Sequence, residues 1–381
     1  MRVYLDNAAT TPLDEEVFEA MKPYMLDFYG NPSSIHTHGN QVKSGLEKAR
    51  KKVADLLNAA PSEIFFTSGG TEADNTAIRC TIDTYGIRHA ITSRIEHHAV
   101  LHTLQHVEKE GKVKLHYVNL DEKGRIDMGH LGRLLQESGE KCFVSLMHGN
   151  NEIGNITDIG AVAELCKEYG AVYHSDTVQT VGHYRHDLQA LKCCSIVGSA
   201  HKFHGPKGVG FLYVNAEHKI HPMITGGAQE RNMRGGTENV YGIIGLAKAL
   251  EIAYRDMDEH QKHIQGIKDH MIGKLTEAIP GVAFHGDSAN ADKSLYTVLN
   301  VSVPNVDDNA MLLFNLNIQE ISASGGSACS SGSSIGSHVL AEMANKGENR
   351  GAVRFSFSKR NTTEEIDYVV DKLADSVNVP A

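Results

Sequence analysis

Lys202 is the residue of this sequence whose setting most directly suggests chemistry. It lies between two short apolar runs, residues 194–197 and 209–214, and each run is typical of a buried strand bounded by glycine. A lysine at the end of a strand is held on a rigid element and is partly desolvated, which lowers its pKa and favours a Schiff-base amine. Because a lone lysine is more often an ordinary surface residue, other residues must support this role.

Polar residues also follow other apolar runs, where strands are expected to end. Residues 67–71, Thr-Ser-Gly-Gly-Thr, join a predicted strand to a predicted helix, so their backbone and the helix N-terminus could hold an anion. Asp176, Asn151 and Gln179 lie at or just after other strand ends, and His97 begins a helix. Taken singly, each of these residues fits a turn or a helix cap as well as it fits a catalytic role.

The combination is more specific than its members. Pyridoxal phosphate requires a Schiff-base lysine, an acid that keeps its ring nitrogen protonated, and donors for its phosphate. Lys202, Asp176 and the loop at residues 67–71 supply these groups, and hydroxyls are available at Ser199 and Thr237. The set therefore predicts a pyridoxal phosphate site.

The elements that must position these residues alternate between strand and helix. From residue 64 to residue 176 the alternation predicts an α/β fold with a mostly parallel sheet, whose carboxyl strand ends gather ligands. Beyond Tyr254 we expect a long helix at residues 258–277 and a smaller α+β unit with strands at 296–303, 318–322 and 352–357. We divide the chain into a large domain, residues 14–254, and a small domain, residues 1–13 and 255–381.

The composition narrows the classes of protein to which this chain could belong. The chain has 381 residues, 41% of them hydrophobic, and a formal net charge of −10, which makes nucleic acid an unlikely partner. We find no apolar stretch typical of a signal peptide or membrane helix, and six scattered cysteines fit a reducing cytoplasm. Cys193 and Cys194, with His201 and His204 nearby, suggest a metal cluster, but adjacent residues of a strand point to opposite faces; we expect no metal site.

With these motifs in view, the chain resembles the cysteine desulfurases of the NifS/IscS type, which are class V aminotransferase-like, fold-type I pyridoxal phosphate enzymes. The resemblance extends over most of the chain, and it is carried by residues 4–12, 30–34, 67–75, 96–100, 148–154, 174–179, 199–202, 233–239 and 326–329. It implies a large domain with a seven-stranded sheet between helices, a smaller α+β domain, and a homodimer.

The resemblance also implies a role for each matching residue. Lys202 would bind the cofactor and move the substrate α-proton, Asp176 would pair with the ring nitrogen, and His97 would stack on the ring and act in acid-base chemistry. Gln179 would contact the ring hydroxyl. The remaining roles concern the phosphate and the substrate: Gly70, Thr71, Ser199 and His201 for the phosphate, Thr237 reaching it from the neighbouring subunit, and Asn151 and Arg354 for the substrate.

Cys329 distinguishes the expected reaction from others of this fold. It lies in a loop of small residues, about 322–337, in which a mobile thiolate could meet both a substrate and an outside partner. The resemblance implies that L-cysteine yields L-alanine and a Cys329 persulfide, whose sulfur passes to an acceptor protein for iron–sulfur clusters, thio-cofactors or tRNA. The alternatives are a selenocysteine lyase, another class V lyase or aminotransferase, and a cofactor-binding regulator without enzymatic activity.

Overall fold

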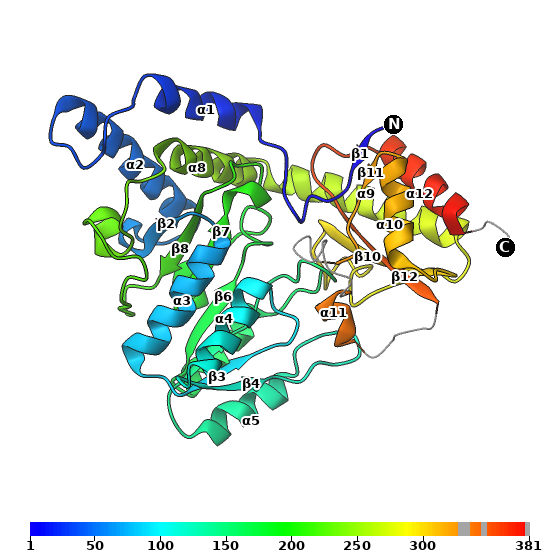
Figure 1. Cartoon of the computed structure of the whole chain (residues 1–381), viewed down its shortest axis with the longest axis horizontal. Helices are drawn as coiled ribbons and strands as arrows, with labels where there is room; N and C mark the ends of the chain where they lie inside the picture. The colour runs from blue at the N-terminus through cyan, green and yellow to red at the C-terminus, as the bar shows by residue number, and fades with distance from the viewer. Residues whose placement is uncertain (327–335, 344–348, 378–381) are drawn as a thin grey trace.

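The computed structural model describes residues 1–326, 336–343 and 349–377, and its largest element is a seven-stranded sheet (Figure 1). The strand order is β2-β8-β7-β6-β5-β3-β4, and β8 is antiparallel to both of its neighbours, whereas the other pairs are parallel. The mostly parallel α/β sheet expected from the sequence is therefore confirmed. Its strands are β2 (Ile64–Thr67), β3 (His89–Thr92), β4 (Lys114–Tyr117), β5 (Cys142–Ser145), β6 (Val172–Asp176), β7 (Ser195–Ser199) and β8 (Gly210–Val214).

Helices cover both faces of this sheet, as a parallel sheet requires. On one face, α3 (Gly70–Tyr85) and α4 (His98–Lys109) pack their apolar sides on the strands. The other face carries the larger core, formed with α2 (Thr37–Leu56), α5 (Met128–Ser138), α6 (Ile159–Glu168) and α8 (Val240–Arg255), and α1 (Glu15–Leu26) packs against α8. Cys193 and Cys194 are buried in different cores on the two faces, as expected for thiols that do not share a metal.

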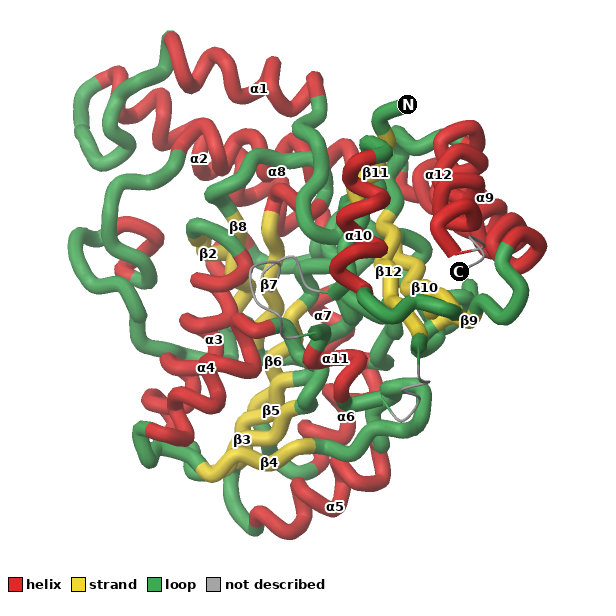
Figure 2. Tube along the Cα trace, turned by 45° about the vertical axis from the view of Figure 1, so that its right-hand side comes forward, coloured by secondary structure: helices red, strands yellow, loops and turns green. Residues whose placement is uncertain are grey.

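A second, smaller sheet lies beside the first and has the antiparallel order β12-β10-β9. The long α9 (Met257–Ala278) and α12 (Thr363–Val377) run side by side and share its core (Figure 2). The other elements of this part are β1 (Val3–Tyr4), β9 (Ala283–Phe284), β10 (Val298–Pro304), α10 (Asn309–Ile318), β11 (Ile321–Ser322), α11 (His338–Ala341) and β12 (Arg350–Ser356). The division into domains at residues 13/14 and 254/255 stays a prediction.

One element, α8, has no counterpart among the sequence expectations, and one expectation needs correction. The sequence of α8 is apolar around much of its circumference rather than amphipathic, as is typical of a helix buried between other layers. The expected strand at 318–322 is shorter, since α10 continues to Ile318 and the chain turns through Glu320, whose φ is +61°. Short, weakly periodic segments such as this one do not distinguish helix from strand.

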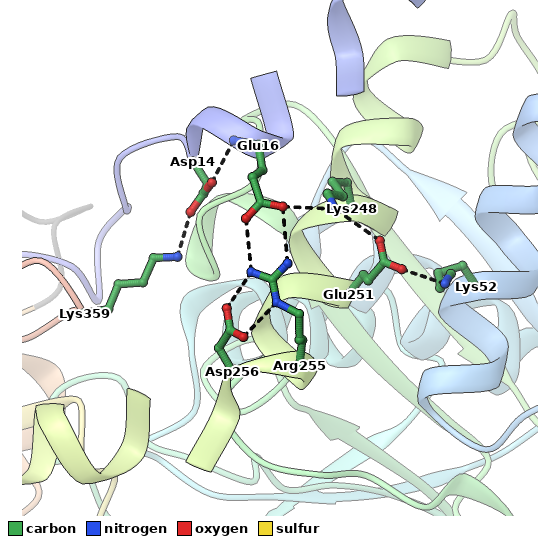
Figure 3. Close-up of polar contacts among 8 residues, drawn as sticks. All are labelled: Asp14, Glu16, Lys52, Lys248, Glu251, Arg255, Asp256 and Lys359. Carbon is green, nitrogen blue, oxygen red and sulfur yellow. Dashed lines mark hydrogen bonds and ion pairs between the residues drawn. The ribbon is translucent and has the colours of Figure 1, made fainter. Parts of the chain in front are cut away.

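An ion-pair network joins the N-terminal helix to later parts of the chain (Figure 3). Asp14 caps α1 and pairs with Lys359 at 2.7 Å, while Glu16 lies 3.1 Å from Arg255 and 3.3 Å from Lys248. The network continues from Lys248 through Glu251 to Lys52 on α2. Among the described helices, none is both long and apolar enough to span a membrane.

Candidate active site

A cavity of about 210 Å³ opens at the carboxyl ends of the central strands. Among the predicted site residues that the structure describes, it contains all except Thr237, although these residues are spread over most of the chain. Because parallel strands end at one edge of a sheet, their following loops meet there. The lining is formed by Ala8, Ala9, Gly70, Thr71, Asp74, His97, Met147, Asn151, Asp176, Val178, Gln179, Ser199, His201, Lys202 and Arg354.

The turn between β2 and α3 suits an anion. Gly69 precedes the helix with a φ of +157°, a conformation that residues with a side chain rarely adopt, and α3 begins at Gly70. A Cβ atom at Gly70 would lie 2.7 Å from Val178, so the turn leaves space only for glycine. The N–H groups of a first helical turn lack helical partners, and here that turn borders the cavity through Gly70 and Thr71.

Ser199 and His201 lie across from this turn, at the end of β7. Ser199 is the last residue of the strand and is 3% exposed, and His201 lies in the following 3₁₀ turn. Burial, and then Lys202 and Lys207, lower the pKa of His201 to about 4, so its ring is neutral at neutral pH. One ring nitrogen, Nδ1, lies 3.2 Å from Thr10 Oγ1.

Lys202 ends the 3₁₀ turn that follows β7 and points toward the N-terminal segment. Its Nζ donates hydrogen bonds to the main-chain oxygens of Ala8 and Ala9, at 2.5 and 3.0 Å. The main-chain oxygen of Lys202 is 3.1 Å from a ring nitrogen of His183. The position of the amine is therefore set by a rigid strand on one side and by residues 8–9 on the other.

Asp176 and Gln179 come from the end of β6. Asp176 Oδ1 accepts a hydrogen bond from the main-chain N–H of Val178 at 2.9 Å, which folds the turn back over the strand. Gln179 Nε2 donates to the Ala8 oxygen at 3.1 Å, so Gln179 and Lys202 share this acceptor. A carboxylate fixed in this way at a cavity wall can keep an aromatic ring nitrogen protonated.

His97 caps the N-terminus of α4. Its Nδ1 accepts the Ala99 N–H at 3.1 Å, which leaves Nε2 as the nitrogen that carries the proton. Burial lowers the pKa of His97, and the nearby Asp176 opposes this effect. The neutral ring lines the cavity and can stack on a planar ligand or donate a hydrogen bond to it.

Arg354, on β12, comes from the smaller sheet and is 1% exposed. It donates to the Asn151 main-chain oxygen at 2.9 Å and to Asp6 Oδ1 at 2.7 Å. Its Nε has no hydrogen-bond partner among the described residues, although it is buried. A guanidinium with a spare donor at a cavity wall suits a carboxylate.

The structure adds Asp74 to the predicted residues. Asp74 lies one helical turn after Gly70, on the side of α3 that borders the cavity. Carboxylate oxygens of Asp74 and Asp176 and a ring nitrogen of His97 all lie within 4.8 Å of one another. This spacing alone would also suit a metal ion, which was not expected from the sequence. The helical spacing from Gly70 could have identified Asp74 in advance.

Of the predicted residues that the structure describes, one does not line the cavity. Thr237 is exposed, and Cys329 lies outside the described residues, as does much of the loop expected at 322–337. The described residues before Cys329 are held beside the cavity, because Ser324 exchanges main-chain hydrogen bonds with Arg354, at 3.2 and 2.6 Å. The described segment that leads toward Cys329 therefore lies next to Arg354, the residue predicted to bind the substrate.

A second cavity lies behind Lys202 and Gln179, on the side of α8 and α9. It holds about 30 Å³, enough for about two water molecules and too little for a cofactor. The 210 Å³ cavity, with its glycine turn at a helix N-terminus, its strand-end carboxylate and its lysine, fits pyridoxal phosphate.

Comparison with known proteins agrees with this geometry. The model of the aminotransferase class-V family matches residues 3–369. The cysteine desulfurase IscS of Dictyoglomus turgidum is 42% identical, covering 97% of this chain and 93% of that protein. The putative cysteine desulfurase IscS 1 of Bacillus subtilis is 41% identical, covering 99% and 98%.

Comparison with solved structures also identifies relatives of the NifS type. A NifS-like protein superimposes with a TM-score of 0.91 and 37% identity, and the match covers both chains completely. A NifS-like protein from Rickettsia africae has a TM-score of 0.88 at 30% identity, again over the whole of both chains. The fold, the cavity and these relatives agree that the chain belongs to the aminotransferase class-V family and, within it, to the pyridoxal phosphate-dependent cysteine desulfurases of the NifS/IscS type.

Proposed function

We propose that this chain removes sulfur from L-cysteine, leaves L-alanine and a persulfide on Cys329, and passes the sulfur to an acceptor protein. The observation that carries the proposal is the gathering of the predicted cofactor and substrate residues around one cavity, with the approach to Cys329 fixed beside Arg354. The names of the IscS relatives support the same reaction.

The residues that would hold the cofactor form three groups. The Gly70–Thr71 turn, Ser199 and His201 would bind the phosphate, and Asp176 would pair with the ring nitrogen. When bound, pyridoxal phosphate supplies an electron-accepting ring that stabilises negative charge on the substrate α-carbon. His97 would cover the ring and Gln179 would contact its hydroxyl.

The chain's other residues would bind the substrate and move its protons. Arg354 would bind the substrate carboxylate through its fork, with Asn151 beside it. Lys202 Nζ would take the α-proton, since the amine is held at the cavity wall by Ala8 and Ala9.

Cys329 would be the acceptor of the sulfur atom. The substrate C–S bond breaks and an S–S bond forms to Cys329 Sγ, while the carbon keeps the electron pair and takes up a proton. L-cysteine and a thiol thus give L-alanine and a persulfide, so atoms and electrons balance without an added oxidant.

Mass spectrometry of the intact chain after incubation with L-cysteine tests this step. We expect the addition of one sulfur atom, mapped to Cys329, and its loss in Cys329→Ala together with sulfide production. Cys80→Ala on α3 is the control, since Cys80 is a buried thiol outside the cavity. Sulfide production at the normal rate by Cys329→Ala would contradict the proposal and favour a lyase that does not need this thiol.

We infer also that two copies form a homodimer in which Thr237 of each serves the other's phosphate. The exposure of Thr237 outside its own cavity supports this. A mixture of Lys202→Ala and Thr237→Ala chains tests it, because each mixed dimer would contain one intact site. Activity should rise well above that of either variant alone; no rise on mixing would contradict the arrangement. The cytoplasmic location and the identity of the acceptor stay predictions.

A further inference from the structure

Three carboxyl groups lie close together beneath the cavity, and they come from different elements. Asp176 ends β6, Asp74 is on α3, and Glu96 immediately precedes His97 at the start of α4. Their exposed fractions are 5%, 1% and 1%. Placing more than one negative charge in such a region is costly, because burial and mutual repulsion both act against it.

Of the three carboxyl groups, Asp176 is the one best suited to carry a negative charge. Its Oδ1 accepts a main-chain N–H, a hydrogen bond that favours the ionised form. No main-chain N–H of the described residues donates to Asp74, whose Oδ1 lies 3.2 Å from His174 Nε2. Burial, then Asp176, then Glu96 raise the pKa of Asp74 well above its ordinary value.

The two histidine rings close to Asp74 do not compensate a second negative charge. Burial lowers the pKa of His174 to about 4 and also lowers that of His97, so both rings are neutral at neutral pH. Glu96 is an acid whose pKa is raised to about 8, and Lys202 borders the same cavity.

The contacts of His174 fit a neutral Asp74. The ring is fully buried, with Nε2 toward Asp74 and Nδ1 2.9 Å from Ser195 Oγ. A protonated Asp74 can donate to Nε2 while Nδ1 donates to Ser195, and each of the three side chains then has a partner without added charge. Asp74 borders the cavity, whereas His174 and the Ser195 hydroxyl beyond it are buried, so this chain of contacts leads from the cavity into the core.

We propose that Asp74 is a positioning residue that keeps its proton at neutral pH and so leaves Asp176 as the charged carboxylate of the cavity. This inference rests on the proposed role of Asp176 toward pyridoxal phosphate. It implies that an amide at position 74 can replace the acid, whereas a small apolar side chain cannot, since it leaves His174 Nε2 unpaired in the core.

Infrared difference spectra provide the direct test. Wild type minus Asp74→Asn, recorded at pH 7.5 with and without bound cofactor, should contain the carbonyl band of a protonated carboxyl group. Asp83→Asn is the matched control, because Asp83 is on the same helix and pairs with Lys112 at the surface. A carboxylate band in place of the carboxylic acid band would overturn the proposal. If Asp74→Asn does not fold, infrared spectra of wild-type protein with ¹³C-labelled aspartate provide the test instead. Absence of the band of a protonated aspartyl group in these spectra would refute the proposal.

Cofactor binding gives a second readout. We expect Asp74→Asn to bind pyridoxal phosphate within about threefold of wild type and Asp74→Ala to lose about tenfold or more. Equal losses in both variants would overturn the proposal, because they would mean that the charge of Asp74 is needed. Absence of cofactor binding in the wild type would instead refute the proposed function, and the infrared result without cofactor would still stand.

Discussion

The ion-pair network around α1 and the carboxyl groups beneath the cavity use the same acidic residue types in opposite ways. At the surface, Arg255 and Lys248 lower the pKa of Glu16, so the carboxyl group is ionised over a wide pH range (Figure 3). Beneath the cavity, burial raises the pKa of Asp74 and Glu96. The environment of an acid, rather than its identity, therefore decides its charge.

The comparison also separates stability from function. Exposed ion pairs contribute little to stability because water and salt screen them. Burying an acid costs stability, and such costs are typical of functional sites. Removing the charge of Asp176 should therefore have a large effect, whereas replacing a protonated acid such as Asp74 by its amide, or removing one charge from the surface network, should have a small effect.

The largest effect is expected for Asp176→Asn. Asparagine keeps the shape of the side chain but removes the charge that would hold the ring nitrogen protonated, so kcat/KM for L-cysteine should fall by roughly 100-fold or more. Steady-state sulfide assays and the pH dependence of the cofactor's visible absorption measure this. Asp74→Asn is the internal comparison, and similar activity of both variants would show that the two acids do not differ as proposed.

An intermediate effect is expected for Glu96→Gln, and it should depend on pH. The pKa of Glu96 in the folded chain is about 8, above its value of about 4.3 in an unfolded chain, so the folded state retains a proton that the unfolded state loses. This contribution to stability is full below pH 4 and is lost as the pH rises through about 8. Relative to wild type, the free energy of unfolding of Glu96→Gln should rise by roughly 3.5 kcal/mol between pH 5 and pH 8.

Urea unfolding at a series of pH values measures this gain. Glu108→Gln on α4 is a suitable control, because that carboxylate is exposed and lies at the other end of the helix. A difference between Glu96→Gln and wild type that stays constant with pH would contradict the raised pKa of Glu96.

The smallest effect is expected for Arg255→Gln. This change removes ion pairs to Glu16 at 3.1 Å and Asp256 at 2.7 Å, but all three side chains are partly or largely exposed. The thermal midpoint should fall by less than about 2 °C, and the difference should vanish in about 1 M salt. Lys51→Gln, which breaks another exposed ion pair, should lower the thermal midpoint by a similarly small amount. A larger, salt-independent loss would mean that the network is a structural requirement.

Much of the site follows from the sequence because it depends on strand ends. Lys202, Asp176 and Ser199 each end or follow a recognisable apolar run, and the sheet brings those ends together. Arg354 was assigned through family resemblance alone, since its approach from the smaller sheet depends on packing between sheets.

Other features could not be predicted, for physical reasons. The apolar sequence of α8 has no single polar face, so its burial is decided by the layers around it. The charge state of Asp74 depends on Asp176 and Glu96, which are distant in sequence and meet only in the folded chain. Local patterns contain no information about such long-range electrostatics.

The N-terminal segment has a consequence for biosynthesis. Ala8 and Ala9 accept hydrogen bonds from Lys202, Thr11 N–H donates to the His201 oxygen, and β1 pairs with β11. Residues 3–11 are therefore translated some 190 to 320 residues before the residues with which they pair. The contacts of Ala8 and Ala9 with the Lys202 amine can form only after β2 to β7 have been translated, and the pairing of β1 with β11 can form only later still. A nascent chain halted before β11 would therefore have all seven strands of the large sheet but would lack the partner of β1 and the Arg354 side of the cavity.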